Sequence, residues 1–406
     1  MRRSAEALAA ALADLESKSL RRQRFTATPD GGAYVLRDGR RVVNFCSNDY
    51  LGLAQHPALI AAMQASAAHS GAGSGASHLV TGHGSEHEAL ERELAEFTGR
   101  ERALLFSTGY MANLGVVSAL AERSDLVLED RLNHASLIDA GLLSRAELQR
   151  YAHGDADAAQ AALVQFRRTH SSRDGSQSDD RRGALLVTDG VFSMDGDLAP
   201  LPALARAARE QDAWLIVDDA HGLGVLGANG GGCLEHFGLG SDDVPVLIGT
   251  LGKAFGSFGA FVAGDAALID WLIQRARTYI YTTALPQPVA AATRAALALM
   301  RTEAWRRAKL REHVDHFRER ARRRGLALAD SAGHQITPIQ PIVLGDAQRA
   351  LDVSAKLLDA GWWVAAIRPP TVPQGSARLR VTLSAAHDAE QIDGLVDALA
   401  QACESA

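Results

Sequence analysis

Short apolar runs alternate with longer amphipathic stretches through the middle of the chain. The short runs are typical of buried strands, and the longer stretches repeat apolar residues at the spacing of a helix. This alternation predicts an α/β fold, with a mostly parallel sheet covered by helices on both faces. The expected strands are 103–106, 126–128, 184–188, 214–217 and 246–248, and the expected helices are 112–121, 135–143 and 200–211.

The pattern changes after residue 285. A long helical stretch comes first, short apolar runs follow it, and a last helical stretch ends the chain. This order is typical of a separate, smaller α+β domain. The long stretch covers residues 290–323, and the apolar runs lie near 342–344, 362–367 and 379–383.

The two patterns set the expected domain boundaries. We expect residues 46–285 to form a large domain, residues 286–406 a small one, and residues 1–45 to pack with the small domain. The segment 171–183 is polar and rich in Ser, Asp and Arg, which predicts a flexible surface insertion between a helix and a strand.

Composition and charge narrow the class of protein. The chain has 406 residues, 47% hydrophobic and 22% charged, as in a soluble globular protein. Its net charge of −6 argues against a nucleic-acid-binding protein, whose surface would be basic. No stretch is long and apolar enough to predict a membrane helix. The three cysteines are far apart and lack metal-binding spacing, which favours a reducing compartment, so we expect a cytoplasmic protein.

Polar residues follow several of the expected strands directly. The carboxyl ends of parallel strands meet at one edge of a sheet, where α/β proteins bind their ligands. The placement therefore predicts one shared site to which the following residues contribute: Thr108, Asp130, Ser193, Asp218 and Thr250.

Lys253 lies in a glycine-rich turn after the strand expected at 246–248. A lysine in a partly desolvated pocket has a lowered pKa and reacts as a neutral amine with an aldehyde, forming a Schiff base. Taken alone, Lys253 is equally well explained as a surface lysine in a turn. A phosphate-binding P-loop is excluded, because Leu247 replaces the required glycine and Ala254 the required Ser or Thr.

Asp218 ends the apolar run 214–217, and His221 follows shortly after it. A carboxylate at the end of a buried strand needs a partner, and the protonated nitrogen of a pyridine ring would be one. His221 is placed to reach a phenolic oxygen on the same ring. A turn cap at Asp218 and a core histidine at His221 are the alternatives. With Lys253, the pair predicts pyridoxal phosphate (PLP) as the cofactor.

The segment 107–113 lies between an expected strand and an expected helix. Backbone N–H groups and the helix dipole favour a phosphate at such a junction, and Gly109 would allow its close approach. The signal is weak alone, because many helices begin this way.

His134 and Ser193 are further candidates for contacts with the cofactor ring. His134 follows the strand expected at 126–128, and its flat imidazole is suited to stack on the ring; helix capping by Asn133 is the alternative. Ser193 is placed to hydrogen-bond the ring or His221, or is a plain loop hydroxyl.

Three other patterns are interpreted as structural. The glycines at 71–76 lack the third glycine of a dinucleotide motif and follow a helical pattern, so we expect an active-site loop or a turn. The arginine-rich stretch 306–324 carries interspersed acids, which is typical of a solvated helix face. His83 and His87 lack both the acid of a zinc-protease motif and a third ligand, so no metal site is expected.

In this order and each after a strand, these residues resemble the α-oxoamine synthases, PLP enzymes of fold type I. The resemblance covers nearly the whole chain, and it is greatest to the members that make 8-amino-7-oxononanoate. Two prolines before Thr371 are typical of those members. The segments that carry the resemblance are 44–53, 107–113, 191–197, 218–222, 249–256, 366–373 and 378–380.

The resemblance implies a role for each residue around the cofactor ring. Lys253 would hold the cofactor as a Schiff base and later remove the α-proton of the amino acid. Asp218 would pair with the pyridine nitrogen and His221 with the phenolic oxygen, while His134 would stack on the ring.

Further residues are implied for the phosphate and the substrates. Asn48 and Arg368 would bind the carboxylate of the amino acid, and Arg21 and Thr371 would lie near the acyl thioester. The phosphate would be held by Gly109, Tyr110 and Thr250, with Thr282 or Thr283 of the partner subunit, because sites of this family lie at the interface of a homodimer.

The implied activity is that of a PLP-dependent acyltransferase of biotin biosynthesis. It would condense L-alanine with pimeloyl-CoA, or with a pimeloyl carrier-protein thioester, and release the thiol and CO2. A family member that joins glycine to acetyl-CoA is the nearest alternative, and a PLP-binding scaffold subunit is another. Two features depart from the family pattern: Asp189 stands where close relatives often have Glu, and the segment 171–183 is longer than expected.

Overall fold

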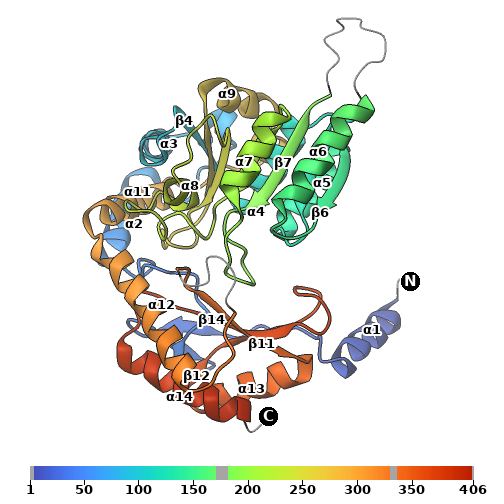
Figure 1. The fold of residues 1–406 in the computed structure, drawn as a ribbon. Helices are drawn as coiled ribbons and strands as arrows, with labels where there is room; N and C mark the ends of the chain where they lie inside the picture. The colour runs from blue at the N-terminus through green and yellow to red at the C-terminus, as the bar shows by residue number, and fades with distance from the viewer. Residues whose placement is uncertain (1–3, 171–181, 330–335, 405–406) are drawn as a thin grey trace, which may run out of the picture. The chain divides into compact units, whose positions relative to one another are not determined.

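The chain folds into two compact units. The computed structural model describes residues 4–170, 182–329 and 336–404. The large unit comprises Leu53–Ser193 and Asp197–Arg307, and the small unit Met1–Gly52, Met194–Gly196 and Ala308–Ala406 (Figure 1). Most of the expected insertion at 171–183 lies outside the described residues.

The chain passes between the units at four places. The first lies at Gly52 and the last at Arg307, inside helix α12 (Trp305–Arg323). Between them, the three residues Met194–Gly196 belong to the small unit. The domain boundaries expected near residues 45 and 285 remain predictions, because this division into units does not test them.

A seven-stranded sheet forms the centre of the large unit. The predicted α/β class is confirmed, although the strand at one edge and an antiparallel strand next to the other edge were not predicted. The antiparallel strand is β10, which pairs with β4 and β9 on either side, while the remaining neighbours are parallel. In sheet order the strands are β4 (Arg102–Phe106), β10 (Ala260–Gly264), β9 (Val246–Thr250), β8 (Trp214–Asp218), β7 (Ala184–Asp189), β5 (Leu126–Asp130) and β6 (Glu147–Tyr151).

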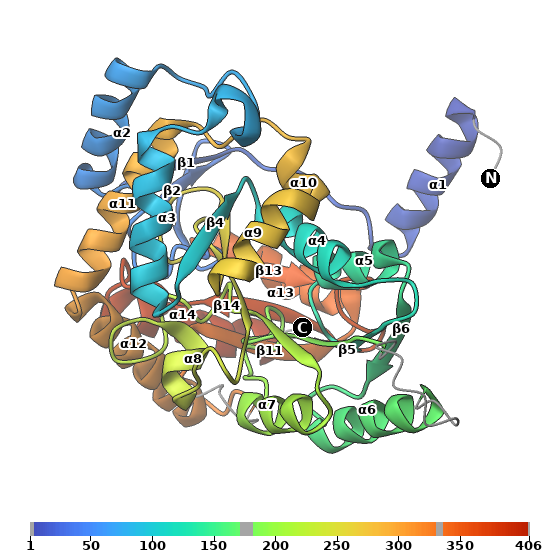
Figure 2. The ribbon, with the colours of Figure 1, turned by 90° about the horizontal axis from the view of Figure 1, so that it is seen from above.

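Helices cover both faces of this sheet. Figure 2 shows α4, α5, α9 and α10 on one face and α6 and α7 on the other. The first group packs a continuous apolar core on the strands, with Val116, Ile216 and Leu272 among its fully buried members. The helices of the large unit are α2 (Pro57–Ser70), α3 (Ser85–Thr98), α4 (Gly109–Leu120), α5 (Ala135–Ser144), α6 (Ala156–His170), α7 (Leu201–Glu210), α8 (Gly232–Phe237), α9 (Ala266–Arg275), α10 (Arg277–Ile280) and α11 (Gln287–Thr302), with a π-helical turn, η1 (His78–Gly82).

The strand ends of the large unit meet at one edge. Asp189 and Asp218 are opposite each other on β7 and β8, and Asp218 is level with Ile248 on β9. Across β10, Phe106 at the end of β4 is level with Thr250 at the end of β9. The loops that follow these strands therefore begin side by side, as the sequence predicted.

The small unit contains two sheets and most of the chain's C-terminal helices. Residues near the N-terminus enter it through β3, which pairs in parallel with β12. None of its described helices, and none of those in the large unit, has both the length and the apolar composition to cross a membrane. The first sheet has the order β1 (Ala27–Pro29), β2 (Tyr34–Arg37), β3 (Arg40–Asn44), β12 (Trp362–Trp363), the second β11 (Ile339–Gly345), β14 (Ala377–Thr382), β13 (Ala365–Ile367), and the helices are α1 (Ala5–Ser17), α13 (Ala347–Asp359), α14 (Ala389–Glu404) and most of α12.

Candidate active site

Asp218 presents a buried carboxylate at the edge of the large sheet. Its side chain lies at the end of β8 and is 6% exposed. One oxygen, Oδ2, accepts a hydrogen bond of 2.7 Å from the side-chain amide of Asn113, and Oδ1 accepts one of 3.1 Å from the backbone N–H of Ala220. Each oxygen is thus oriented by one neutral donor, which leaves the carboxylate able to accept a further hydrogen bond.

Lys253 and His221 are in direct contact. The Nζ atom of Lys253 lies 2.9 Å from Nε2 of His221. The turn that carries Lys253 is closed by a hydrogen bond of 2.8 Å from Gly256 to the carbonyl of Lys253. Gly256 has φ of +62°, and a Cβ there would lie 2.4 Å from the backbone nitrogen of Ala54, so this position requires glycine. The buried carboxylate thus ends β8, the imidazole follows in the loop after it, and the primary amine lies in the loop after the adjacent strand β9.

His134 is oriented by hydrogen bonds at both its backbone and its ring. Its backbone N–H donates to Oδ2 of Asp189 at 2.7 Å, and its ring Nδ1 lies 2.7 Å from the hydroxyl of Ser136. His134 also caps the N-terminus of α5, since Nδ1 accepts a hydrogen bond from the backbone N–H of Ser136. The helix cap that the sequence suggested for Asn133 is therefore provided by His134.

Burial and charge set the protonation preferences of this group. Burial lowers the pKa of His134, Asp218 raises it, and Lys253 lowers it. Burial raises the pKa of Asp189 well above its usual value, and the charge of Asp218 on the neighbouring strand raises it further. Both shifts favour the neutral forms of His134 and Asp189.

The start of α4 offers a site for an anion. Thr108 caps the helix, because its hydroxyl accepts a hydrogen bond from the backbone N–H of Met111. A Cβ added at Gly109 would meet nothing within 4 Å, so the backbone of the first turn is open to a ligand. Tyr110 is exposed and its hydroxyl donates to Asp139, a contact that raises the pKa of the tyrosine. Thr250 donates from its hydroxyl to the carbonyl of Gly259 at 3.2 Å.

The remaining candidates of the large unit lie in loops. Ser193 is half-buried in the loop after β7, directly before the residues that belong to the small unit. Thr282 and Thr283 lie between α10 and α11, the first half-buried and the second exposed.

Asp130 is part of a different arrangement. It lies at the end of β5 as predicted, but Oδ1 is 3.0 Å from Nδ1 of His153, whose Nε2 is 2.9 Å from Asp197. Burial lowers the pKa of His153, but the hydrogen bonds to Asp130 and Asp197 outweigh it and raise the pKa to about 10. A charged imidazolium between two carboxylates therefore ties the end of β5 to the loop that carries Ser193.

In the small unit, Asn48 is paired with an arginine that the sequence analysis had not assigned. Nη1 of Arg380 donates to Oδ1 of Asn48 at 3.1 Å and to the hydroxyl of Thr382 at 2.9 Å. Arg380 is only 6% exposed and lies on β14. A buried guanidinium next to an amide is suited to bind a carboxylate.

Arg368, Arg21 and Thr371 line a cavity of about 720 Å³ in the small unit. Arg368 donates to the backbone carbonyls of Ser19 and, at 3.5 Å, of Arg21, while the hydroxyl of Thr371 accepts a hydrogen bond of 3.2 Å from Arg22. The cavity therefore combines several guanidinium groups with an apolar wall, which is suited to an anionic ligand with an aliphatic part.

His83 and His87 gain a neighbour that the sequence did not reveal. In the folded chain His78 joins them, and the three rings hold ligand atoms within 4.8 Å of one another. His87, however, accepts from the backbone N–H of Gly84 at 2.9 Å and contacts the carbonyl of Leu285 at 2.5 Å, so both its ring nitrogens are engaged. The hydrogen bonds of His87 to the backbone therefore favour a structural role for these three histidines.

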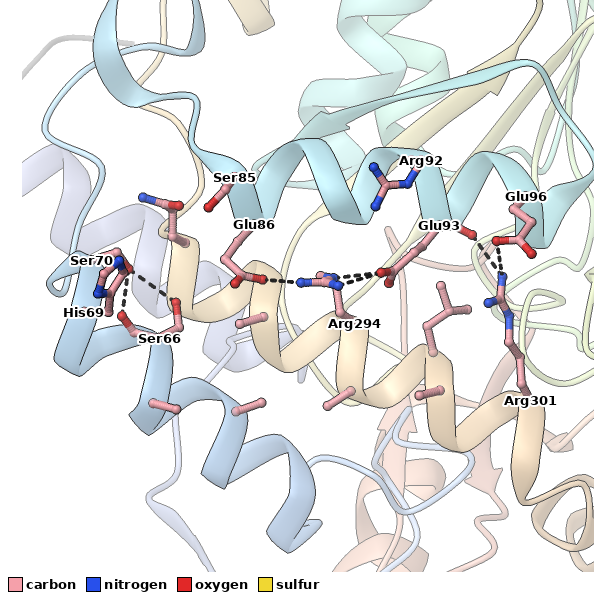
Figure 3. A pocket seen from close by; sticks show the side chains of 17 residues that line it. Ser66, His69, Ser70, Ser85, Glu86, Arg92, Glu93, Glu96, Arg294 and Arg301 are labelled. Carbon is pink, nitrogen blue, oxygen red and sulfur yellow. Dashed lines mark hydrogen bonds and ion pairs between the residues drawn. The ribbon is translucent and has the colours of Figure 1, made fainter.

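A hollow of about 840 Å³ lies elsewhere, between α2, α3 and α11 (Figure 3). Arg294 reaches Glu86 at 2.8 Å and Glu93 at 2.7 Å across it. None of the candidate site residues is among its lining residues within the described chain. Arg294 and Arg301 are paired with the acids Glu86, Glu93 and Glu96 that line it, so we assign it no part in the chemistry.

Asn113, Ser136 and Arg380 are functional candidates that the sequence analysis missed. Asn113 has a sequence signal, because it is a polar residue in the otherwise apolar stretch 111–117. Ser136 and Arg380 have none, since a serine at a helix start and an arginine in a strand are common. Only their contacts with His134 and Asn48 single them out.

Comparison with known proteins gives one family and close relatives. The sequence profile of the family described as aminotransferase class I and II matches residues 40–399. An 8-amino-7-oxononanoate synthase of Methylococcus capsulatus is 61% identical over 394 residues, which are 97% of each chain. One of Pseudomonas putida is 58% identical over 395 residues, covering 97% of this chain and 96% of the relative.

Solved structures of the same kind match over nearly the whole chain. Serine palmitoyltransferase of S. paucimobilis with bound PLP–myriocin aldimine has a TM-score of 0.89 at 27% identity, covering 98% of this chain and 97% of that one. An 8-amino-7-oxononanoate synthase of Francisella tularensis has a TM-score of 0.74 at 32% identity, covering 90% of this chain and 98% of that one. These are fold type I proteins, in agreement with the expected fold.

Proposed function

Because the chain belongs to the aminotransferase class I and II family, and within it to the 8-amino-7-oxononanoate synthases, we propose that it condenses L-alanine with a pimeloyl thioester. The products are 8-amino-7-oxononanoate, CO2 and the free thiol, in a step of biotin biosynthesis. The observation that carries this proposal is the meeting of Lys253, His221 and Asp218 at one sheet edge in a chain so similar to these synthases.

The cofactor is pyridoxal phosphate, and the residues of the large unit fit it. When bound, it supplies an aldehyde that condenses with amines and a ring that accepts electrons from the α-carbon of the amino acid. The amine of Lys253 suits the aldehyde, and the buried carboxylate of Asp218 suits a protonated ring nitrogen. The open first turn of α4 at Gly109 suits the phosphate.

Lys253 is the group that moves protons. Its Nζ takes the α-proton of alanine as a general base, and His221, 2.9 Å away, holds this amine in place and would hydrogen-bond the phenolic oxygen of the cofactor. Asp218 would keep the ring nitrogen protonated, and the imidazole of His134 would stack on the ring. Gly109, Tyr110 and Thr250 hold the phosphate.

Polar and charged side chains of the small unit hold the substrates. Asn48 binds the carboxylate of alanine, and its contact with Arg380 adds a second guanidinium candidate to Arg368 for this role. Arg21 and Thr371, in the cavity of about 720 Å³, contact the acyl thioester. The protein acts as a homodimer in the cytoplasm, and Thr282 or Thr283 of the partner subunit completes the phosphate site.

The release of free thiol by the PLP-loaded protein tests the substrate assignment. The assay compares L-alanine plus pimeloyl-CoA with glycine plus acetyl-CoA, and we expect release only with the first pair. Release only with the second pair would overturn the substrate assignment but keep the cofactor chemistry. Release with neither leads to the same assay with a pimeloyl carrier protein, and failure there as well would contradict the proposal.

Replacing Lys253 by Ala tests the catalytic assignment. The variant loses the base and the covalent anchor together, so we expect product formation to fall by several orders of magnitude, at least the ~10²–10⁴-fold range for a general base alone. Lys309→Ala is the matched control, because this lysine donates to the backbone carbonyl of Ala385 in the small unit. A Lys253→Ala protein that turns over like the control would refute the assignment.

A further inference from the structure

Asn113 connects two parts of the site that lie on different elements. It is on α4, is 1% exposed, and follows the open turn at Gly109. Its side-chain nitrogen donates to Oδ2 of Asp218 at 2.7 Å and to the hydroxyl of Ser136 at 2.8 Å. Both hydrogens of the amide are thus used, one on β8 and one on α5.

The direction of these hydrogen bonds follows from the chemistry of the partners. A carboxylate oxygen accepts, so the nitrogen of Asn113, and not its oxygen, faces Asp218. The same nitrogen then donates to the hydroxyl of Ser136, which leaves the hydroxyl hydrogen for Nδ1 of His134 at 2.7 Å. The backbone N–H of Ser136 also points to this Nδ1 at 3.3 Å.

A ring nitrogen that receives two donors has no proton of its own. Nδ1 of His134 is therefore an acceptor, and a neutral imidazole in this position carries its proton on Nε2. Reversing the amide of Asn113 would place its oxygen against the carboxylate of Asp218, which the charge disfavours. The chain of contacts from Asp218 to His134 consequently has one direction.

We infer that Asn113 is a positioning residue that orients the carboxylate of Asp218 toward the cofactor and, through Ser136, selects the Nε2–H tautomer of His134. The inference rests on the proposed PLP chemistry. It goes beyond that chemistry in one respect. The side-chain amide of Asn113 orients both Asp218, which would face the ring nitrogen, and His134, which would stack on the ring, so a change at Asn113 should affect both residues.

The charges around His134 agree with a neutral ring. Burial lowers its pKa, Asp218 raises it, Lys253 lowers it and Asp139 raises it. Asp189 accepts from the backbone N–H of His134 and so holds its main chain without touching the ring nitrogens that the tautomer concerns.

The test uses three variants of the PLP-loaded protein with the chain otherwise complete. Asn113→Leu removes both donors, and Ser136→Ala removes only the link to His134. Ser118→Ala is the control, because Ser118 is exposed on the same helix and its hydroxyl donates to the backbone carbonyl of Leu114. The readouts are the PLP dissociation constant and the ¹⁵N shifts of the His134 ring, assigned by their loss in His134→Gln.

We expect the wild-type protein to show the Nε2–H tautomer of His134. Asn113→Leu and Ser136→Ala should both lose this preference. The PLP dissociation constant should rise by roughly 10- to 100-fold in Asn113→Leu, the range for a lost hydrogen bond to a charged group, and by less than about threefold in Ser136→Ala. Ser118→Ala should match the wild type in both readouts.

Several results would overturn the inference. These are an Nδ1–H or charged ring in the wild type, an unchanged tautomer in Ser136→Ala, or an Asn113→Leu protein that binds PLP like the control. If Asn113→Leu does not fold, the tautomer in Ser136→Ala decides alone. The readouts do not depend on turnover, so a failure of the substrate assignment would leave them intact and the two failures can be told apart.

Discussion

His134 and His153 lie at the same edge of the large sheet, each in the loop after a strand and each near carboxylates, yet their protonation preferences are opposite. Burial and Lys253 lower the pKa of His134, although Asp218 raises it. Burial also lowers the pKa of His153, but its two hydrogen bonds to Asp130 and Asp197 raise it to about 10.

The difference comes from what each imidazole nitrogen contacts. Both nitrogens of His153 reach a carboxylate oxygen, so the cation is the form that satisfies them. Nδ1 of His134 reaches a hydroxyl and a backbone N–H, while Asp189 contacts only its main chain in the hydrogen bonds found. One arrangement holds a loop, and the other favours the neutral imidazole that we propose to face the cofactor.

The largest expected effect on product formation is at Asp218, the carboxylate near His134. Asp218→Asn removes the charge proposed to keep the cofactor ring protonated, and we expect product formation to fall by about 10²–10³-fold or more. The same change on the His153 side, Asp130→Asn, is the control and should leave turnover within about threefold. Steady-state kinetics of both variants checks this, and equal losses would mean that the two regions do not differ in role.

The second effect concerns stability. His153→Leu leaves Asp130 and Asp197 facing each other without a cation, so the free energy of unfolding should fall by about 3 kcal/mol. Turnover at saturating PLP should change far less. Urea unfolding measures the loss, with His236→Leu at an exposed position of α8 as the control. A variant as stable as that control would show that the imidazolium does not hold the loop.

The pH dependence of stability should separate the two histidines. The pKa of His153 is about 10 in the folded protein, above the unfolded value of about 6.5, so its contribution is full below about pH 6.5 and is lost as the pH rises toward 10. The difference in unfolding free energy between wild type and His153→Leu should therefore shrink over that range. For His134 the lowered pKa gives the reverse sign, and stability is lost as the pH falls below about 6.5. A difference that stays constant from pH 7 to 10 would contradict the charge assigned to His153.

The smallest effect is expected at Asp189. Burial and the charge of Asp218 raise its pKa, so an amide at this position resembles the protonated acid and keeps an oxygen for the N–H of His134. Asp189→Asn should change turnover and PLP affinity by less than about threefold, as measured by kinetics and cofactor titration. A loss of more than tenfold would show that the negative charge of Asp189 is needed. Asp189 would then not be the neutral acid that its raised pKa indicates.

Much of the difference between His134 and His153 could not be predicted from the sequence. Lys253, Asp218 and His221 were predicted because each follows a buried strand, and strand ends meet at one edge whatever the details of packing. His153 was overlooked, since β6 is half-exposed and lacks the apolar run that marked the other strands. Strand β10, second from one edge of the sheet, was overlooked as well, because a short apolar run does not reveal that it is a strand or in which direction it pairs.

The sequence by itself determined the alternation of strands and helices, the loops that carry the reactive side chains, and the residue types available to a PLP enzyme. These follow from local periodicity and from residues next to one another in the chain. Only the tertiary structure decided which groups touch and which proton each one holds. The pKa and the direction of a hydrogen bond depend on partners far away in sequence, as Asn113 is from Asp218 and His153 from Asp197.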